Sequence, residues 1–201
     1  MGKKTEQSKI VYDKMALEYD EKPEGFYTKA HKEELLRKVV LSDGDTILDV
    51  ACGNGYLLSE LSKKAKVKAF GVDIAKAMIA VAKKRYPECD FQAQPSFPLE
   101  FENNTVDVIT VSCAFHHFED PQGFADECKR VLKDGGEIYL AEPYFTPLIR
   151  FVANAFVFPF THSGDVKVYS AKELCSFFKK AGFSKMRTYE KGTIQFFTAM
   201  K

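Results

Sequence analysis

The chain has 201 residues, of which 45% are hydrophobic, and its 29 basic residues nearly balance its 28 acidic residues. This length suits a single domain with a substantial core, and the balanced charge argues against a nucleic-acid partner. Five dispersed cysteines without a C-x-x-C pair favour reduced thiols over a disulfide framework. Because no signal peptide or membrane-spanning run is evident, we expect a cytoplasmic protein.

Predicted strands and helices alternate along the first 142 residues. Apolar residues at helical spacing indicate the helices, and short apolar runs indicate the strands. Such alternation is typical of an α/β fold with a parallel sheet and helices on both faces. In chain order, the sequence predicts helices at about 9–19 and 29–40, a strand at 46–50, a helix to about 64, a strand at 67–74, a helix at 75–85, a weak strand at 90–93, a strand at 106–114, a helix at 121–132 and a strand at 137–142.

The pattern changes after residue 142. A proline-containing aromatic segment covers 143–169 and includes a stretch with the spacing of an amphipathic helix. This helix either faces the core or forms a lid over a ligand, and the two interpretations stay open. Its apolar residues are Leu148, Phe151, Val152, Ala155 and Phe156.

The C-terminal part predicts a helix and a hairpin. The helix covers 171–181 and is followed by Gly182, a favoured residue just past a helix end. Two strand-like runs then follow, separated only by Lys191 and Gly192. Because so short a link cannot make a parallel crossover, we expect these last two strands to be antiparallel.

The most informative motif is ILDVACGNGYLL, residues 47–58. A strand leads into a turn of alternating small residues, and an apolar helix start follows. Small residues at Ala51, Gly53 and Gly55 let a ligand approach the backbone closely. The free N–H groups at the start of the helix can bind polar ligand atoms. A plain turn needs only one glycine, so the motif favours a nucleotide or nucleoside site.

Two acidic residues complete this predicted site. Asp49 lies in the first strand and Asp73 ends the second, and neighbouring parallel strands bring their carboxyl ends to one crevice. The Asp73 carboxylate can accept hydrogen bonds from both hydroxyls of a ribose. Alternatively, it caps the helix that begins at Ala75, which requires no ligand. The nearby glycine turn favours the ligand interpretation.

Four motifs in this order resemble those of one family. They are Asp-x-Ala-x-Gly-x-Gly, GVDIAKAM, CAFHHFEDP and RVLKDGGEIYLAE. The stretch from about Tyr12 to Glu142 resembles class I S-adenosylmethionine-dependent methyltransferases, in particular the small-molecule group that includes the ubiquinone and menaquinone methyltransferases. The resemblance implies one domain with a Rossmann-like, seven-stranded, mostly parallel sheet and a C-terminal antiparallel hairpin. It also implies cover helices at 1–40 and a lid-like insertion at 143–169.

The resemblance further implies S-adenosyl-L-methionine as the cofactor and S-adenosyl-L-homocysteine as its product. The glycine turn would hold the methionine part, Asp73 the ribose, and Ile74 and Met78 the adenine. The whole implied cofactor-binding set is Tyr12, Tyr19, Asp49, Ala51, Cys52, Gly53, Asn54, Gly55, Asp73, Ile74, Met78, Gln94, Ser96, Phe97, Ser112 and Cys113.

Two positions depart from the family's pattern. Pro95 stands where the family normally has an Asp beside the adenine amino group, so a backbone carbonyl or Gln94 would replace that contact. Ala51 replaces a commoner glycine. We expect this to be a small change, because alanine tolerates an extended backbone.

No catalytic triad is evident, and methyl transfer from a sulfonium needs none, because orientation alone can lower the barrier by about 7–11 kcal/mol. His116 is a weak candidate for a general base, although the pair with His117 is better explained as the hydrogen-bonded end of a strand. Adjacent histidines without a third ligand nearby predict no metal site. The candidates for a substrate pocket, which would suit an apolar or aromatic small molecule, are Phe115, His116, Tyr144, Phe151 and Phe156.

Two other functions remain as alternatives. One is a non-catalytic protein that binds S-adenosylmethionine. The other is a nicotinamide-dependent oxidoreductase, which also uses a glycine turn and a distal acid. The turn disfavours the oxidoreductase, because it lacks the third glycine of G-x-G-x-x-G.

Overall fold

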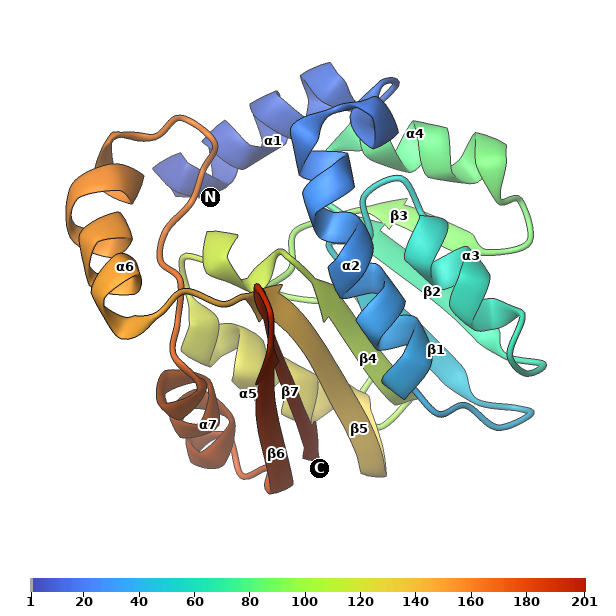
Figure 1. Ribbon diagram of the computed structural model, residues 1–201. Coiled ribbons are helices and arrows are strands. Elements are labelled where there is room, and N and C mark those ends of the chain that lie inside the picture. The colour runs from blue at the N-terminus through green and yellow to red at the C-terminus, as the bar shows by residue number, and fades with distance from the viewer. Residues whose placement is uncertain (1) are drawn as a thin grey trace.

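The computed structural model describes residues 2–201 and is built around one seven-stranded sheet in the order β3-β2-β1-β4-β5-β7-β6 (Figure 1). The strands are β1 (Thr46–Val50), β2 (Lys68–Asp73), β3 (Asp90–Ala93), β4 (Val106–Ser112), β5 (Leu132–Pro143), β6 (Ser184–Lys191) and β7 (Ile194–Met200). The α-helices are α1 (Lys3–Met15), α2 (Pro23–Lys38), α3 (Tyr56–Ser62), α4 (Lys76–Arg85), α5 (Pro121–Val131), α6 (Pro147–Val152) and α7 (Ala171–Lys180). Shorter helical segments are η1 (Tyr19–Glu21), η2 (Phe115–His117), η3 (Ala153–Val157) and η4 (Phe158–Phe160).

The pairing of the strands confirms the predicted α/β fold and its terminal hairpin. Strands β1 to β5 pair in parallel, whereas β7 is antiparallel to both β5 and β6. The strand predicted at 137–142 begins earlier, at Leu132. Leu132 pairs with Val106 and Glu137 with Val108, so residues 133–136 form a bulge in β5 that has no partner in the register with β4.

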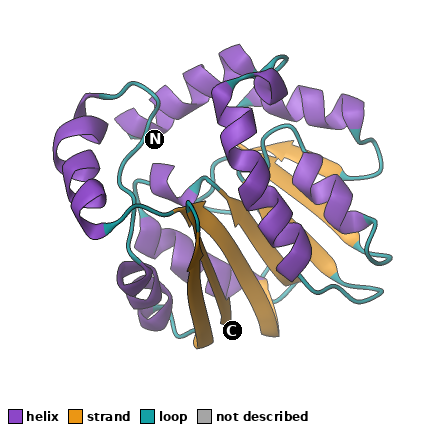
Figure 2. Ribbon diagram, viewed as in Figure 1, coloured by secondary structure: helices purple, strands orange, loops and turns teal. Residues whose placement is uncertain are grey.

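The two faces of the sheet are covered by different helices (Figure 2). In β1, Ile47 packs in one apolar cluster with residues of α2 and α3, and the adjacent Leu48 packs in a second cluster with residues of α5 and α7. This division follows from strand geometry, in which successive side chains point to opposite faces. Packing on both faces fixes the carboxyl ends of the parallel strands in space.

The N-terminal helices both start earlier than predicted. α2 begins at Pro23, whose fixed φ and missing N–H suit the first helical position. α1 lies above the carboxyl ends of the parallel strands, beside α4 (Figure 1). Asp13 ties the two helices together, because its Oδ1 accepts the Ala77 N–H at 2.8 Å. Tyr19, which follows α1, packs on Met78 of α4 in a third apolar cluster.

The segment after β5 leaves the sheet and carries α6, η3 and η4. Leu148, Phe151 and Phe156 are 74%, 63% and 65% exposed, so the amphipathic helix predicted here does not face the core. The chain then returns to η2, where the Val166 and Lys167 N–H groups donate to the His116 carbonyl at 2.9 and 3.1 Å. Within residues 2–201, no helix has the length and apolar character needed to cross a membrane.

Candidate active site

A cavity of about 570 Å³ lies at the carboxyl ends of the parallel strands, with α1 on one side. It receives residues from the turns after β1, β2, β3 and β4, and also from the start of α4. Its lining includes the following members of the predicted cofactor-binding set: Tyr12, Tyr19, Ala51, Gly53, Asp73, Ile74, Met78, Gln94, Ser96, Phe97, Ser112 and Cys113.

The turn after β1 has a left-handed backbone at three positions. The φ angles of Ala51, Gly53 and Gly55 are 57°, 54° and 82°. The expectation that Ala51 is extended is therefore wrong. A residue with a Cβ in this region costs about 1–2 kcal/mol, so the turn holds a local strain that glycine would relieve.

The two glycines of this turn serve different purposes. A Cβ at Gly53 would meet no atom within 4 Å, and Gly53 borders the cavity, so a ligand can approach its backbone there. A Cβ at Gly55 would lie 2.7 Å from Phe91 Cζ and 2.9 Å from Ala82 Cβ. Gly55 is therefore required by the packing of the turn against α4 and β3.

Asp73 connects the turn after β1 to the turn after β2. Its Oδ2 accepts the Gly53 N–H and its Oδ1 accepts the Ala75 N–H, both at 2.8 Å. The capping interpretation is wrong, because α4 begins at Lys76 and has no side-chain cap; Asp73 instead fixes the turn that precedes the helix, and its carboxylate borders the cavity. Each oxygen keeps a second lone pair for a ligand hydroxyl. Burial raises the pKa of Asp73 to about 6, which leaves it ionised at neutral pH.

Asp49 lies behind the turn and does not border the cavity. It is buried, and its Oδ1 accepts the Thr110 hydroxyl at 2.6 Å. Burial raises the pKa of Asp49 to about 7, opposed by the Thr110 hydrogen bond and the positive charge of Lys32. Lys32 Nζ is in turn 5.1 Å from the centre of the Tyr19 ring. Asp49 therefore links β1 to β4 behind the cavity wall.

Tyr12 of α1 meets His117 of η2 at one wall of the cavity. The Tyr12 hydroxyl lies 3.3 Å from His117 Nε2, and the two rings meet edge to face with 5.8 Å between centres. Burial raises the pKa of Tyr12 and lowers the pKa of His117, so both side chains are uncharged at neutral pH. Uncharged aromatic groups are suitable neighbours for a sulfonium cation, which is attracted to ring faces.

The loop after β3 forms another part of the cavity wall. Gln94 is buried there, and its Oε1 accepts the Glu100 N–H at 2.9 Å while its Nε2 donates to Gln92 Oε1 at 3.3 Å. Gln94 was expected as one possible replacement for the family's Asp. Part of its hydrogen-bonding capacity is already used by groups of its own loop. Pro95 and Ser96 border the cavity next to it.

Four predicted cofactor-binding residues, Asp49, Cys52, Asn54 and Gly55, do not border the cavity. Asn54 instead joins the turn to η1, because its Nδ2 donates to Asp20 Oδ1 at 2.7 Å. The other oxygen of Asp20 pairs with Arg85 Nη1 at 2.6 Å. Asn54 therefore connects the turn to η1 and, through Asp20, to Arg85 of α4.

The structure does not bring the five substrate-pocket candidates together. Phe115 is fully buried in the core, because η2 turns its ring toward α5 and α7. His116 is directed at Glu142, whose Oε2 lies 2.8 Å from His116 Nδ1. Tyr144, Phe151 and Phe156 follow β5 and do not border the cavity.

The histidine that borders the cavity is His117, whereas the sequence favoured His116. The prediction placed both histidines at the end of a strand. In the structure the chain instead turns into η2 at this point. The adjacent residues Phe118 and Glu119 also border the cavity and were missed, although the CAFHHFEDP motif contains them. Glu119 accepts the Thr5 N–H at 3.1 Å and so caps the start of α1 over the cavity.

The sequence and the fold are similar to those of known proteins. Residues 48–140 match a family model described as a methyltransferase domain. A demethylmenaquinone methyltransferase of Thermotoga maritima is 30% identical over 186 residues, covering 84% of this chain and 80% of that protein. A protein of the same name from Chlorobaculum parvum is 28% identical over 158 residues, covering 69% of this chain and 66% of its own length. Phosphoethanolamine N-methyltransferase 2 of Haemonchus contortus, solved in complex with S-adenosyl-L-methionine, has a TM-score of 0.75 at 16% identity over 94% of this chain and 57% of that chain.

The chain belongs to the family of S-adenosylmethionine-dependent methyltransferases, whose cofactor is S-adenosyl-L-methionine. The residues present fit this group. The open space above Gly53 leaves room for a ligand against the backbone, and the Asp73 carboxylate faces the same cavity. The family assignment replaces the alternative of a nicotinamide-dependent oxidoreductase.

Proposed function

We propose that this protein transfers the methyl group of S-adenosylmethionine to a small molecule with an apolar or aromatic body. The observation that carries the proposal is the single cavity that extends from Gly53 and Asp73 to Tyr12 and His117. One end has groups for a nucleoside, and the other has aromatic and apolar walls. The relatives named demethylmenaquinone methyltransferases support an aromatic acceptor.

Each part of the cofactor has candidate partners in the cavity wall. The backbone at Ala51 and Gly53 would hold the methionine part, and Asp73 would accept hydrogen bonds from the ribose hydroxyls. Such bonds to a charged group are worth about 1.5–3 kcal/mol each. Ile74 and Met78 both border the cavity, and they would pack on the adenine.

Catalysis would rest on orientation more than on an acid or base. The bound cofactor supplies a methyl group that its sulfonium already activates, so the protein must align the acceptor and exclude water. Tyr12 and His117 would orient the acceptor from the α1 side. The cover helices at 1–40 would close this side of the site, and the insertion at 143–169 would act as a lid that abuts α1.

Contacts between α1 and the insertion support the lid. Lys4 Nζ donates to the carbonyls of Phe158 and Thr161 at 2.8 and 3.1 Å, and the Ser8 hydroxyl donates to the Ser163 carbonyl at 3.3 Å. A movement of 143–169 would therefore also displace α1, which borders the cavity. The two segments are expected to open together.

The test is transfer of a labelled methyl group from S-adenosylmethionine to a panel of acceptors. The panel would contain hydroquinones, phenols, amines and thiols of increasing apolar size, with nucleic acid as the negative control. The proposal expects label in at least one aromatic or apolar member and none in nucleic acid. Tight cofactor binding without transfer to any member would contradict it and would favour the non-catalytic cofactor-binding protein.

A further inference from the structure

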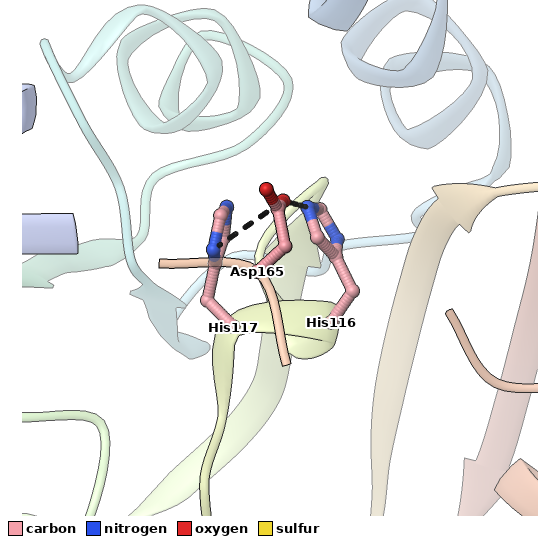
Figure 3. Close-up of side chains that lie close together, drawn as sticks. All are labelled: His116, His117 and Asp165. Carbon is pink, nitrogen blue, oxygen red and sulfur yellow. Dashed lines mark ion pairs between the residues drawn. The ribbon is translucent and has the colours of Figure 1, made fainter. Parts of the chain in front are cut away.

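Two histidines of η2 and one aspartate of a distant loop form a cluster at the edge of the cavity (Figure 3). His116, His117 and Asp165 each direct one ligand atom at the others, and these three atoms lie within 4.8 Å of one another. We propose that this cluster binds a divalent transition-metal ion, with Zn²⁺ as the ion that best matches the donors. Two imidazole nitrogens and one carboxylate are a common protein donor set for this ion.

The distances suit an ion after small side-chain rotations. Asp165 Oδ1 lies 3.6 Å from His116 Nε2 and 3.8 Å from His117 Nδ1. Ligands of a tetrahedral zinc ion are bound at about 2.0–2.2 Å and are therefore about 3.4 Å apart. In Figure 3, both rings stand on the same turn and face the Asp165 carboxylate.

The His116 ring is oriented by a second carboxylate. Its Nδ1 lies 2.8 Å from Glu142 Oε2, while Glu142 Oε1 accepts the N–H groups of Ala114 and Phe115 at 2.8 and 3.0 Å. Glu142 thus has a fixed position and accepts a hydrogen bond from Nδ1, which leaves the His116 Nε2 lone pair directed at Asp165. A histidine that donates its other N–H to a carboxylate is the usual arrangement around protein-bound metals.

The two oxygens of Asp165 are differently engaged. Its Oδ2 accepts the hydroxyls of Thr161, at 3.3 Å, and Ser163, whereas Oδ1 is the atom that faces the histidines. The loop itself is held to η2, because the backbone N–H groups of Val166 and Lys167 donate to the His116 carbonyl. The third ligand, which the sequence argument did not find, is thereby placed beside the pair of histidines.

The charges of the cluster also suit a cation. Glu142 and Asp165 lie on opposite sides of His116 and are both little exposed. A neutral His116 would direct a lone pair at the Asp165 carboxylate, which is repulsive. A metal ion between the two groups removes that repulsion, and a divalent ion also compensates both carboxylates.

The position of the cluster gives the ion a route to solvent and to ligands. His117 borders the cavity, and three protein ligands leave a fourth position for water or a ligand oxygen. If the proposed methyl transfer is correct, that oxygen can belong to the acceptor, and this part of the inference rests on the proposed function. Metal binding itself does not depend on it.

The test is a titration of metal-stripped protein with Zn²⁺ by calorimetry, and with Co²⁺ followed by its visible absorption. The wild-type chain is expected to bind one ion per molecule, and Co²⁺ is expected to give the absorption of a low-coordinate N/O site. Asp165→Asn should weaken binding at least tenfold. Asn can still accept hydrogen bonds from Thr161 and Ser163, so this variant should fold, which thermal melting verifies.

The matched control is His162→Gln. His162 lies in the same loop but is exposed, so its loss should leave the affinity unchanged. Equal binding by the wild-type chain and Asp165→Asn, or equal loss in both variants, would overturn the proposal. Because the readout is metal affinity, a negative result would not affect the proposed methyl transfer, and a failed transfer assay would not affect metal binding.

Discussion

The two left-handed glycines of the turn after β1 give the clearest predictions for single residues. Gly53→Ala and Gly55→Ala share the cost of a Cβ at positive φ, about 1–2 kcal/mol. Gly55→Ala adds a clash with Phe91 and Ala82, and overpacking of this kind costs about 1–3 kcal/mol more. Gly53→Ala adds instead a methyl group at the cavity wall.

We therefore expect the two variants to rank in opposite order by loss of unfolding free energy and by loss of affinity for S-adenosylhomocysteine. Gly55→Ala should lose more unfolding free energy in urea, by about 1–3 kcal/mol relative to Gly53→Ala. Gly53→Ala should lose more affinity for S-adenosylhomocysteine, at least tenfold by calorimetry. The same ranking in both measurements would contradict the separate roles assigned to these glycines.

The raised pKa of Asp49 predicts how the unfolding free energy depends on pH. Its pKa is about 7 in the folded protein and near 4 in an unfolded chain, so the folded state binds the additional proton between these values. The unfolding free energy of the cofactor-free protein should therefore fall as pH rises from about 4 to about 7.

Asp49→Asn should remove this contribution, because the amide has no proton to release and its oxygen can still accept the Thr110 hydroxyl. At about pH 8 we expect the variant to be more stable than the wild-type chain by up to about 4 kcal/mol. Near pH 4 the two should agree. Urea unfolding at both pH values checks this, and a variant that is less stable at pH 8 would show that the carboxylate is instead needed for folding.

At the scale of elements, Asp13 gives a direct test of how α1 is held to α4. The hydrogen bond from the Ala77 N–H to Asp13 is a direct polar link from α1 to α4, beside the apolar cluster that contains Met78. Asp13→Ala should therefore loosen the cover over the cavity without disturbing the sheet.

The expected result is faster hydrogen exchange in α1 and a threefold or greater increase in the dissociation rate of S-adenosylhomocysteine. Asp13→Asn is the matched control, because its amide oxygen can accept the same N–H. If Asp13→Asn and Asp13→Ala behave alike, the negative charge and not the hydrogen bond is what matters.

At the scale of the whole molecule, local sequence patterns predicted the sheet well. The alternation of strands and helices and the short link at Lys191 and Gly192 depend on neighbours along the chain, and both appear in the structure. The same holds for Gly53 and Asp73, which meet at the cavity because parallel strands end at one edge.

Features that depend on distant contacts were not predictable in this way. Phe115 was assigned to a pocket and is in the core, because the turn of η2 decides its direction. Asp165 lies beside His116 only because its loop returns to η2. The apolar residues of α6 have helical spacing that suggests a core, but no element packs over that face in residues 2–201.

The most direct test of the account is calorimetric titration of S-adenosylhomocysteine into the wild-type chain and Asp73→Asn. The account predicts one site in the wild-type chain and at least tenfold weaker binding in the variant, since it loses a charged acceptor for the ribose hydroxyls. Asp134→Asn, at a carboxylate that is 98% exposed, should bind as the wild-type chain does. Unchanged affinity in Asp73→Asn would contradict the placement of the cofactor in this cavity.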